Sequence, residues 1–390
     1  MNFNIFTGFS ELLLAILLGV VQGLTEFLPI SSTAHLRLVS GLFGGKDIGL
    51  TASNIIQFGT LLAILQYFRV DLQVFWQRIW EILGDKTEMQ KFVLTFQNWI
   101  KGGTQEVEID NKNDSKTDLN EQNVEQNNKQ SIHQSKKEVE TKIENNLQKD
   151  LENKAQNETQ GKIQTNPQNT NHSNFETDIL LSQLIIGTIP IVVLGFLLKN
   201  FAESNRNIGE IGFFMIIGAV LLAFGEYFYL QTSKLKHSKI QTFGETLLIG
   251  FFQSMAIFPG MSRSGSTLAG SLFVGRNRME SVRFVFLLSI PALFLSGILD
   301  FLSLIRDIFK NGIAIFPNNN FASSPKIQLS IVSLLISFSL AYVVGLACLR
   351  WLLRFLSKNT NLSFIIYRIF IGFCLILFSF IAAFLGNVRF

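Results

Sequence analysis

Long apolar segments constrain this chain more than any other feature of its sequence. Six runs are each about 18 to 25 residues long, the length at which a helix crosses the hydrocarbon core of a bilayer. They occupy residues 50–68, 178–198, 208–230, 281–304, 328–349 and 363–386. Nearly half of the chain, 48%, is hydrophobic, and the many phenylalanines suit helix surfaces that face lipid. The sequence therefore predicts an all-α integral membrane protein.

A repeated pair of proline-broken segments is the second constraint. Residues 10–28 and 242–258 are apolar, and each ends at a proline that is followed by a cluster of serines. The two regions read LLGVVQGLTEFLPISSTAH at 17–35 and LIGFFQSMAIFPGMSRSGST at 248–267. Three long apolar spans follow each copy, which is the pattern of a duplicated membrane unit.

Alignment of the two copies pairs residues of the same type. Gln22 falls on Gln253, and Ser31 falls on Ser262. Each copy is predicted to form an apolar helix, a proline break, a serine-rich turn and a second short helix.

The repeat suggests how the halves are oriented. If the helices beside each break enter and leave from one face, residues 10–43 and 242–274 form re-entrant hairpins. Each half then contributes three full spans, an odd number, so the two halves are inverted. The first half comprises 1–100 and 177–230, and the second comprises 231–390. In the alternative, the apolar helix of each copy spans fully and the chain has eight spans.

Residues 101–176 interrupt the first half with a different composition. From Asn111 to Asn174 the chain is mostly Asn, Gln, Lys, Glu, Ser and Thr, without an aromatic residue. Such a segment cannot bury enough apolar surface to offset the entropy of ordering, so we predict a disordered insert. Lys and Arg of the short connections gather on the side that carries this insert. The positive-inside rule makes that side cytoplasmic and places both termini outside.

Polar residues cluster at the first break. Gln22 and Glu26 are four residues apart and share one helix face. Ser31 and Ser32 follow the proline and can cap the next helix, which carries His35. Taken alone, a glutamine at this position is explained equally well by a hydrogen bond between helices. Serines after a proline are usually ordinary helix caps.

The second copy adds a positive charge at its break. Gly260 interrupts the helix, and Ser262, Arg263, Ser264 and Gly265 open the next one. A charge at bilayer depth costs about 2.5–3.5 kcal/mol, and irregular backbone survives there only beside protein or a polar cavity. Because both copies carry such groups, we predict one shared polar cavity.

The parts of this cavity suit a phosphate ester or anhydride. Two helix N-termini offer N–H groups to an anion, and Arg263 offers a planar fork for phosphate oxygens. The hydroxyls of Ser31, Ser262 and Ser264 are predicted to bind the same substrate, and Gly265 lets the backbone approach it closely. Glu26 can hold a divalent cation or act as a general base. His35 can act as base, acid or nucleophile.

Other features exclude further classes. Cys348 and Cys374 each lie in an apolar run and fit neither a zinc site nor a disulfide framework, so they are interpreted as packed or lipid-facing thiols. The first 28 residues contain Glu11 and no basic n-region, so no cleavable signal is expected.

At these residues the chain resembles the undecaprenyl-diphosphatase family, the bacitracin-resistance phosphatases of bacterial envelopes. The resemblance rests on QGLTEFLPISSTAH (22–35), IIQFGTLLAI (55–64), IGTIPIVVLGFLL (186–198), PGMSRSG (259–265), FVFLLSIPA (284–292) and IIYRIFIG (365–372). It implies hydrolysis of undecaprenyl diphosphate to the monophosphate, which regenerates the lipid carrier for cell-wall synthesis. It also implies a multi-pass protein of the bacterial plasma membrane whose active site opens to the outer face.

The resemblance implies roles for individual residues. The implied catalytic and substrate-binding residues are Gln22, Glu26, Ser32, His35 and Arg263, with Arg368 as a second phosphate-contacting arginine. A divalent cation, magnesium or calcium, is implied, with Glu26 as its ligand. The chain departs from the family at Ala34, where glycine is usual, and in the insert at 101–176.

Several alternatives remain open at this point. The attacking group is water activated by Glu26 or His35, or else Ser32 or His35 as a covalent nucleophile. A polyprenyl-phosphate transporter would use the same inverted-repeat anion site, although it needs no nucleophile. We expect a lipid substrate within the bilayer, no nucleic-acid partner, and a homodimer as a candidate assembly.

Overall fold

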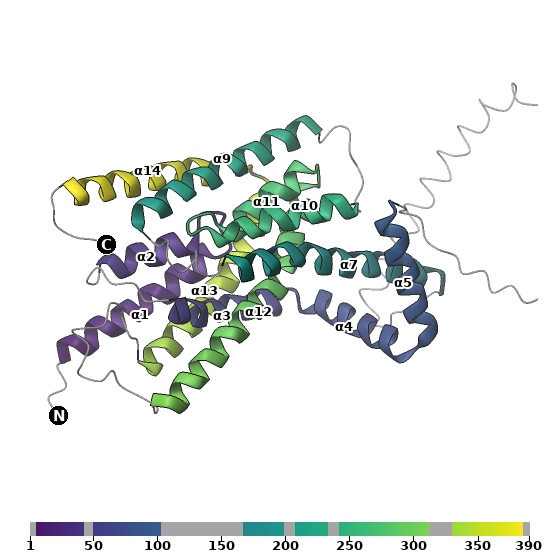
Figure 1. Ribbon diagram of the computed structural model, residues 1–390, viewed down its shortest axis with the longest axis horizontal. Helices are drawn as coiled ribbons and strands as arrows, with labels where there is room; N and C mark the ends of the chain where they lie inside the picture. The colour runs from purple at the N-terminus through teal and green to yellow at the C-terminus, as the bar shows by residue number, and fades with distance from the viewer. Residues whose placement is uncertain are drawn as a thin grey trace, which may run out of the picture. The chain divides into compact units, whose positions relative to one another are not determined.

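The computed structural model describes residues 5–42, 50–102, 167–198, 207–232, 242–311 and 330–384. Within these ranges the chain is helical and contains no β-strand, which confirms the predicted all-α class (Figure 1). The elements are α1 (Ile5–Thr25), α2 (Ser32–Leu42), α3 (Leu50–Tyr67), α4 (Arg69–Gly84), α5 (Lys86–Ile100), α7 (Pro167–Leu197), α9 (Ile208–Thr232), α10 (Phe243–Ser254), η1 (Met255–Ile257), α11 (Arg263–Phe273), α12 (Arg278–Asn311), α13 (Ile331–Leu356) and α14 (Leu362–Phe384).

Five of the six predicted spans are confirmed as helices long and apolar enough to cross a membrane. These segments are Asn174–Leu197, Ile208–Gln231, Arg278–Ile298, Ile331–Leu356 and Leu362–Phe384. The sixth run, 50–68, forms α3, which passes the same test only together with α4. The two helices are bent by 77° at Phe68, so the described part of the chain has five spans, or six if this pair is one.

Both proline-broken segments are helix–turn–helix units, as the repeat predicts. In the first unit α1 ends at Thr25 and α2 begins at Ser32. In the second, α10 continues into the short η1 helix, and α11 begins at Arg263. The apolar stretches Ser10–Thr25 and Phe243–Ile257 are shorter than the five spans.

Helices of the two halves pack against each other through small residues. Figure 1 shows α9 and α14 side by side, and a Cβ on Gly212 of α9 would lie 2.6 Å from the carbonyl oxygen of Gly372 in α14. On α1, a Cβ on Gly23 would lie 2.8 Å from the backbone nitrogen of Gly345 in α13. Such close backbone approach is the usual way in which membrane helices associate.

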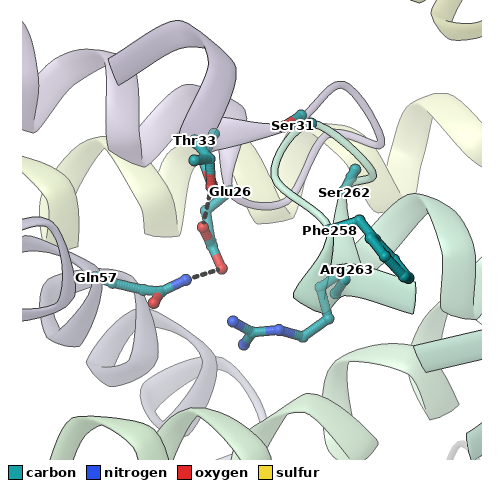
Figure 2. A pocket seen from close by; sticks show the side chains of 10 residues that line it. Glu26, Ser31, Thr33, Gln57, Phe258, Ser262 and Arg263 are labelled. Atoms are coloured by element: carbon teal, nitrogen blue, oxygen red, sulfur yellow. Dashed lines mark hydrogen bonds between the residues drawn. The ribbon is translucent and has the colours of Figure 1, made fainter. Parts of the chain in front are cut away.

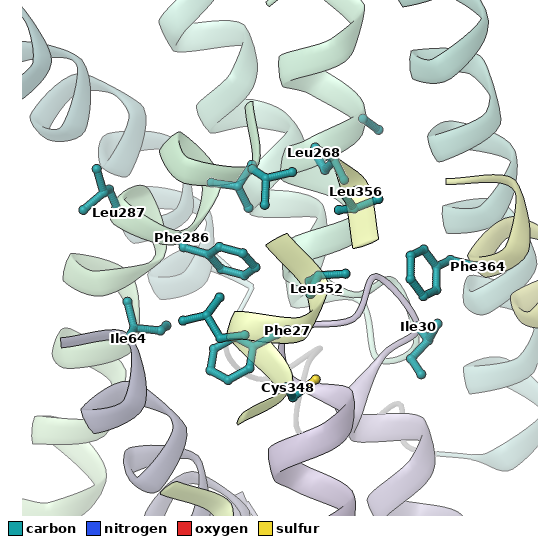
Figure 3. Packing of buried hydrophobic residues seen from close by; sticks show 14 of the residues in the cluster. Phe27, Ile30, Ile64, Leu268, Phe286, Leu287, Cys348, Leu352, Leu356 and Phe364 are labelled. Atoms are coloured by element: carbon teal, nitrogen blue, oxygen red, sulfur yellow. The ribbon is translucent and has the colours of Figure 1, made fainter. Parts of the chain in front are cut away.

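A hydrophobic cluster packs around the backbone of both turns. Phe27, next to the first break, meets Phe286 of α12 edge-to-face with ring centroids 5.6 Å apart. Leu268 of α11 and Leu352 of α13 belong to the same cluster (Figure 3). Because residues of the first turn and of the helix after the second turn are buried in this cluster, both turns are held in place from within the protein.

The structure has two further helices between residues 69 and 100, for which the sequence predicted no element. Helices α4 and α5 follow α3, and Asp85 caps α5 by accepting a hydrogen bond from the Thr87 amide at 2.8 Å. Helix α7 begins at Pro167, so the end of the range predicted to be disordered is helical. Residues 103–166 of that range lie outside the described residues, and their predicted disorder stays a prediction.

Both cysteines behave as the sequence indicated. Cys348 is buried and Cys374 is exposed, and neither forms a disulfide. The Cys348 thiol donates a hydrogen bond to the carbonyl of Leu24 at 3.2 Å, so it is a packed thiol between α13 and α1.

Candidate active site

The two turns share an uncommon backbone conformation. Ser31 has a φ of 74° and Ser262 a φ of 66°, and within the described ranges they are the only non-glycine residues with positive φ. These are the two serines that the repeat aligns. An L-residue in this left-handed region is strained, and such strain persists only where the surrounding structure enforces it. The alignment read from the sequence therefore corresponds to the same local geometry in both copies.

Each serine also starts the helix that follows it. The Ser262 hydroxyl accepts a hydrogen bond from the Gly265 amide at 3.2 Å, and the Ser31 hydroxyl lies 3.5 Å from the Ala34 amide. The carbonyl oxygen of each serine accepts a side-chain hydrogen bond from four residues further on. His35 Nδ1 bonds the Ser31 carbonyl at 2.7 Å, and Ser266 Oγ the Ser262 carbonyl at 2.9 Å.

A polar pocket lies between the two turns (Figure 2). It is lined by Glu26, Ser31, Ser32, Thr33, Gln57, Ala256, Phe258, Gly260, Ser262 and Arg263. Both copies of the repeat contribute to it, together with α3. The predicted shared cavity is therefore present.

Three donors hold the carboxylate of Glu26. Its Oε2 accepts hydrogen bonds from Gln22 Nε2 at 2.9 Å and from Ser32 Oγ at 2.7 Å, and its Oε1 accepts one from Gln57 Nε2 at 2.7 Å. An ionised carboxylate is an acceptor only, so these three neutral donors suit its charged form. The donors come from α1, α2 and α3, which fixes the carboxylate relative to all three helices.

Arg263 faces Glu26 across the pocket. Figure 2 shows its side chain extending from the start of α11 toward Glu26 and Gln57. Its Nε and Nη1 are buried and have no hydrogen-bond partner among the described residues. Buried donors without partners are costly, because they have lost their hydrogen bonds to water and gained none in exchange. This arrangement is that of a site prepared for an anion.

The remaining residues of the second turn support the site rather than line it. Ser264 Oγ contacts the carbonyl oxygens of Glu26 at 3.3 Å and Leu28 at 3.2 Å, which ties the second turn to the first. Gly265 lies beside Arg368, because a Cβ added to it would be 2.6 Å from Nη1 of that arginine. Neither residue lines the pocket, whereas Ser31 and Ser262 do.

His35 lies next to the pocket but does not line it. Its Nδ1 is bonded to the Ser31 carbonyl, and its Nε2 lies 2.7 Å from the hydroxyl of Tyr367, whose ring stacks on the imidazole. Because a carbonyl can only accept, Nδ1 carries a proton. Both ring nitrogens are therefore engaged within the protein.

Arg368 is not among the residues that line the pocket, and the phosphate contact that the resemblance implied stays a prediction. Its side chain is fully buried, at 0% exposure, and does not line the pocket. Its guanidinium donates hydrogen bonds to four backbone carbonyls: Pro29 at 3.2 Å, Met215 at 3.2 Å, Gly260 at 3.2 Å and Met261 at 2.7 Å. Arg368 therefore joins the two broken turns through their backbone carbonyls. An arginine fits this position because unwound turns leave several carbonyls without helical partners.

Sequence reasoning missed two residues of this region. Gln57 orients Glu26 from the middle of an apolar helix, and an amide at bilayer depth was the signal that could have identified it. Tyr367 lies beside His35, far away in sequence, and only the fold brings the two together.

The pocket offers few ligands for a metal ion. Within the described residues no group of three or more His, Cys, Asp or Glu side chains is clustered. Glu26 is the one carboxylate of the pocket, with hydroxyl and amide oxygens beside it. This set suits a hard cation that is shared with substrate, since Mg²⁺ in phosphate sites uses one or two carboxylates plus phosphate oxygens.

The fold and the pocket together define a class of protein. The chain is a multi-pass helical membrane protein in which two broken segments present the Glu26 carboxylate and the Arg263 guanidinium to one polar pocket. Its sequence matches the family model described as bacitracin resistance protein BacA over residues 15–101 and 149–374. The chain belongs to this family.

Relatives from distant bacteria are similar along almost the whole chain. An undecaprenyl-diphosphatase of Gloeobacter violaceus is 31% identical over 362 residues, covering 92% of this chain and 88% of the relative. One from Nocardia farcinica is 31% identical, with 92% of each chain covered. One from Prosthecochloris aestuarii is 30% identical over 380 residues, covering 96% of this chain and 98% of the relative.

Proposed function

We propose that this protein is an undecaprenyl-diphosphatase, which hydrolyses undecaprenyl diphosphate to undecaprenyl phosphate and inorganic phosphate. The observation that carries the proposal is the guanidinium of Arg263, which faces Glu26 and whose buried Nε and Nη1 have no partner in the part of the chain that the structure describes. The name of the matched relatives supports the same reaction. None of these names supports the transporter alternative.

Arg263 binds the terminal phosphate in this proposal. Its fork suits two phosphate oxygens, and an arginine of this kind contributes about 10³-fold or more to phosphoryl transfer. The N-termini of α2 and α11 and the hydroxyls of Ser31 and Ser262 add donors around the same anion. The prenyl chain stays among lipid-facing helices while the diphosphate enters the pocket.

Ser32 is the nucleophile that the geometry favours. Its hydroxyl already donates to Glu26 Oε2 at 2.7 Å, which is the distance between a nucleophile and its general base. Ser32 Oγ attacks the terminal phosphorus and gives its proton to Glu26, and the bond from that phosphorus to the bridging oxygen breaks. Undecaprenyl phosphate leaves. Water then cleaves the phosphoserine, releases inorganic phosphate and restores the Ser32 hydroxyl.

Direct attack by water that Glu26 activates is the second route. His35 has both ring nitrogens engaged outside the pocket, so it serves as a positioning residue in either route. A divalent cation near Glu26 would neutralise charge on the diphosphate when bound. Glu26 is the residue that would hold it, with further ligands from the phosphate oxygens.

Phosphate release from purified protein in detergent tests the function. Detergent removes the two compartments that transport requires, so release of inorganic phosphate from undecaprenyl diphosphate identifies a hydrolase. Near wild-type turnover by both Glu26→Gln and Arg263→Ala would remove this pocket as the active site. A phosphorylated protein trapped by rapid acid quench and lost in Ser32→Ala would assign the nucleophile. Its absence under single-turnover conditions would favour direct attack by water.

We also propose that the two halves are inverted repeats with re-entrant hairpins at 10–43 and 242–274. The matching φ values at Ser31 and Ser262 and the pairing of α9 with α14 support this arrangement. The protein lies in the bacterial plasma membrane, with the pocket open to the outer face and the insert in the cytoplasm. Thiol labelling of Lys46→Cys and Ser135→Cys tests the topology, because it requires the two sites on opposite sides of the membrane. A homodimer stays a prediction.

A further inference from the structure

Helix α4 leaves the bundle at a sharp angle. It follows α3 after the single residue Phe68, and the two helix axes differ by 77°. Helix α4 carries Arg69, Asp71, Arg78 and Glu81 along its 16 residues. A helix that short and that charged does not cross the hydrocarbon core by itself.

Helix α4 has one face that is buried and another that is exposed and apolar. Phe75, Arg78 and Ile82 are buried against the rest of the protein. A second set of side chains, here called the α4 stripe, is exposed and apolar: Trp76, Ile79, Trp80 and Leu83. Spacings of three and four residues place the stripe along one side of the helix.

The two tryptophans dominate the α4 stripe. Trp76 is 62% exposed and Trp80 is 59% exposed, and their rings meet edge-to-face at 5.7 Å. Gln73 and Gln77, both exposed, border the stripe along one side of the helix. An exposed apolar stripe bordered by amides is the pattern of a helix at the boundary between apolar and aqueous surroundings.

Two ion pairs fix the depth of α4. Asp71 pairs with Arg283, which is in the second turn of the span Arg278–Ile298. Arg78 pairs with Asp178 in a two-pronged contact, Nε–Oδ1 at 2.7 Å and Nη2–Oδ2 at 2.9 Å. Asp178 is likewise in the second turn of its span, Asn174–Leu197.

These contacts place α4 across the ends of two spans. Asp71 and Arg78 are separated by about 10 Å along the helix, since each residue adds about 1.5 Å. Each nevertheless pairs with a residue in the second turn of a span, so α4 runs along the membrane boundary rather than away from it.

We propose that α4 is an interfacial helix whose stripe binds the bilayer at the level of the lipid head groups. Tryptophan is enriched at this level, because its ring is apolar and its N–H remains close to water. The partner is therefore the lipid surface on the side that carries the connection between α5 and α7. This inference does not depend on the proposed enzymatic function.

Depth-resolved fluorescence quenching tests the proposal. The full chain, which has four tryptophans, is placed in bilayers of lipids brominated either near the head group or near the chain end. The fluorescence of Trp76 and Trp80 is obtained by subtracting the fluorescence of the variant Trp76→Phe/Trp80→Phe from that of the full chain. Both substitutions are at exposed positions and keep an aromatic ring, so the variant is expected to fold and to release phosphate like the full chain.

The expected result is loss of most of the difference signal with bromine near the head group, and a smaller loss with bromine near the chain end. Aqueous iodide is expected to quench that signal weakly. Strong quenching by iodide and none by either lipid would overturn the proposal, because α4 would then project into water. Strongest quenching from the chain end would also overturn it, because α4 would then lie within the hydrocarbon core. The variant Trp351→Phe, at another exposed position on α13, serves as the matched control.

Discussion

The guanidinium of Arg368 lies in the space that a side chain at Gly218 would occupy. A Cβ on Gly218 would collide with Nη2 of this arginine, and one on Gly265 would come within 2.6 Å of Nη1. Two glycines, one from α9 and one from α11, therefore leave the space that the fully buried guanidinium of Arg368 fills. In this position the guanidinium reaches carbonyls of both broken turns. The shape of the candidate active site therefore depends on a residue that does not line the pocket.

Replacement of Arg368 by lysine is expected to destabilise the protein. A lysine ammonium cannot reproduce the planar fork, and each buried carbonyl left without a donor costs about 1–3 kcal/mol. The thermal unfolding midpoint of Arg368→Lys in detergent should therefore fall, while Arg350→Lys, at an exposed position of α13, should leave it unchanged. An unchanged midpoint combined with a raised KM would instead make Arg368 a phosphate ligand, as the resemblance implied.

Gly218→Ala tests the same packing by changing the glycine instead of the arginine. The added methyl group must displace Arg368, and overpacking of this kind costs about 1–3 kcal/mol. We expect a lower unfolding midpoint and lower turnover together. Gly195→Ala on α7 is the matched control, since no atom lies within 4 Å of its Cβ position. It should be neutral or slightly stabilising. Equal unfolding midpoints for Gly218→Ala and Gly195→Ala would contradict the conclusion that Arg368 holds the two turns together.

Arg263 is expected to lower the free energy of unfolding of the protein when no substrate is bound. Its Nε and Nη1 are buried and have no partner within the described ranges, so removal of the charge relieves a desolvation cost. Arg263→Met should raise the unfolding midpoint and lower kcat/KM by about 10³-fold or more. Arg263→Lys should retain more activity than Arg263→Met. A lower midpoint for Arg263→Met would mean that the arginine has a structural role.

Gln57→Leu isolates the contribution of one hydrogen bond to Glu26. The change removes the donor to Oε1 and leaves the donors to Oε2 in place. A hydrogen bond to a charged group is worth about 1.5–3 kcal/mol, so kcat/KM should fall roughly 10- to 100-fold. Gln231→Leu, at an exposed position of α9, is the control and should not change kcat/KM. Full activity of Gln57→Leu would show that Glu26 needs only two donors.

Metal binding is expected to require the diphosphate. Because Glu26 is the only carboxylate of the pocket, a cation gains enough ligands only when phosphate oxygens join it. A chelator should abolish phosphate release, and magnesium or calcium should restore it. Either cation should raise the unfolding midpoint only in the presence of a non-hydrolysable diphosphate analogue. A midpoint raised by the cation alone would indicate a preformed metal site, and undiminished release in chelator would exclude the cation.

The sequence predicted the parts of this protein that depend on local patterns. Hydrophobic runs located the spans, and the repeat located the two turns, because both signals lie within short stretches of chain. The repeat even paired Ser31 with Ser262, which adopt the same φ region. These features require no knowledge of how distant segments pack.

The features that the sequence did not predict depend on contacts between distant segments. Arg368 and Pro29 are 339 residues apart, and nothing in the sequence of α14 indicates that its arginine binds carbonyls rather than phosphate. The hydrogen bond between His35 and Tyr367 is of the same kind. Helices α4 and α5 were missed for another reason, since their mixture of tryptophans and charges matches neither a span nor a soluble helix.

The ion pair between Arg78 and Asp178 joins residues on either side of the long insertion. It fixes α4 and the first turns of the following span to each other, whatever sequence connects α5 to α7. Closing a longer loop adds little entropy cost once its ends are anchored. Extra chain can therefore accumulate at this position over evolutionary time, and the geometry around Glu26 and Arg263 need not change in response.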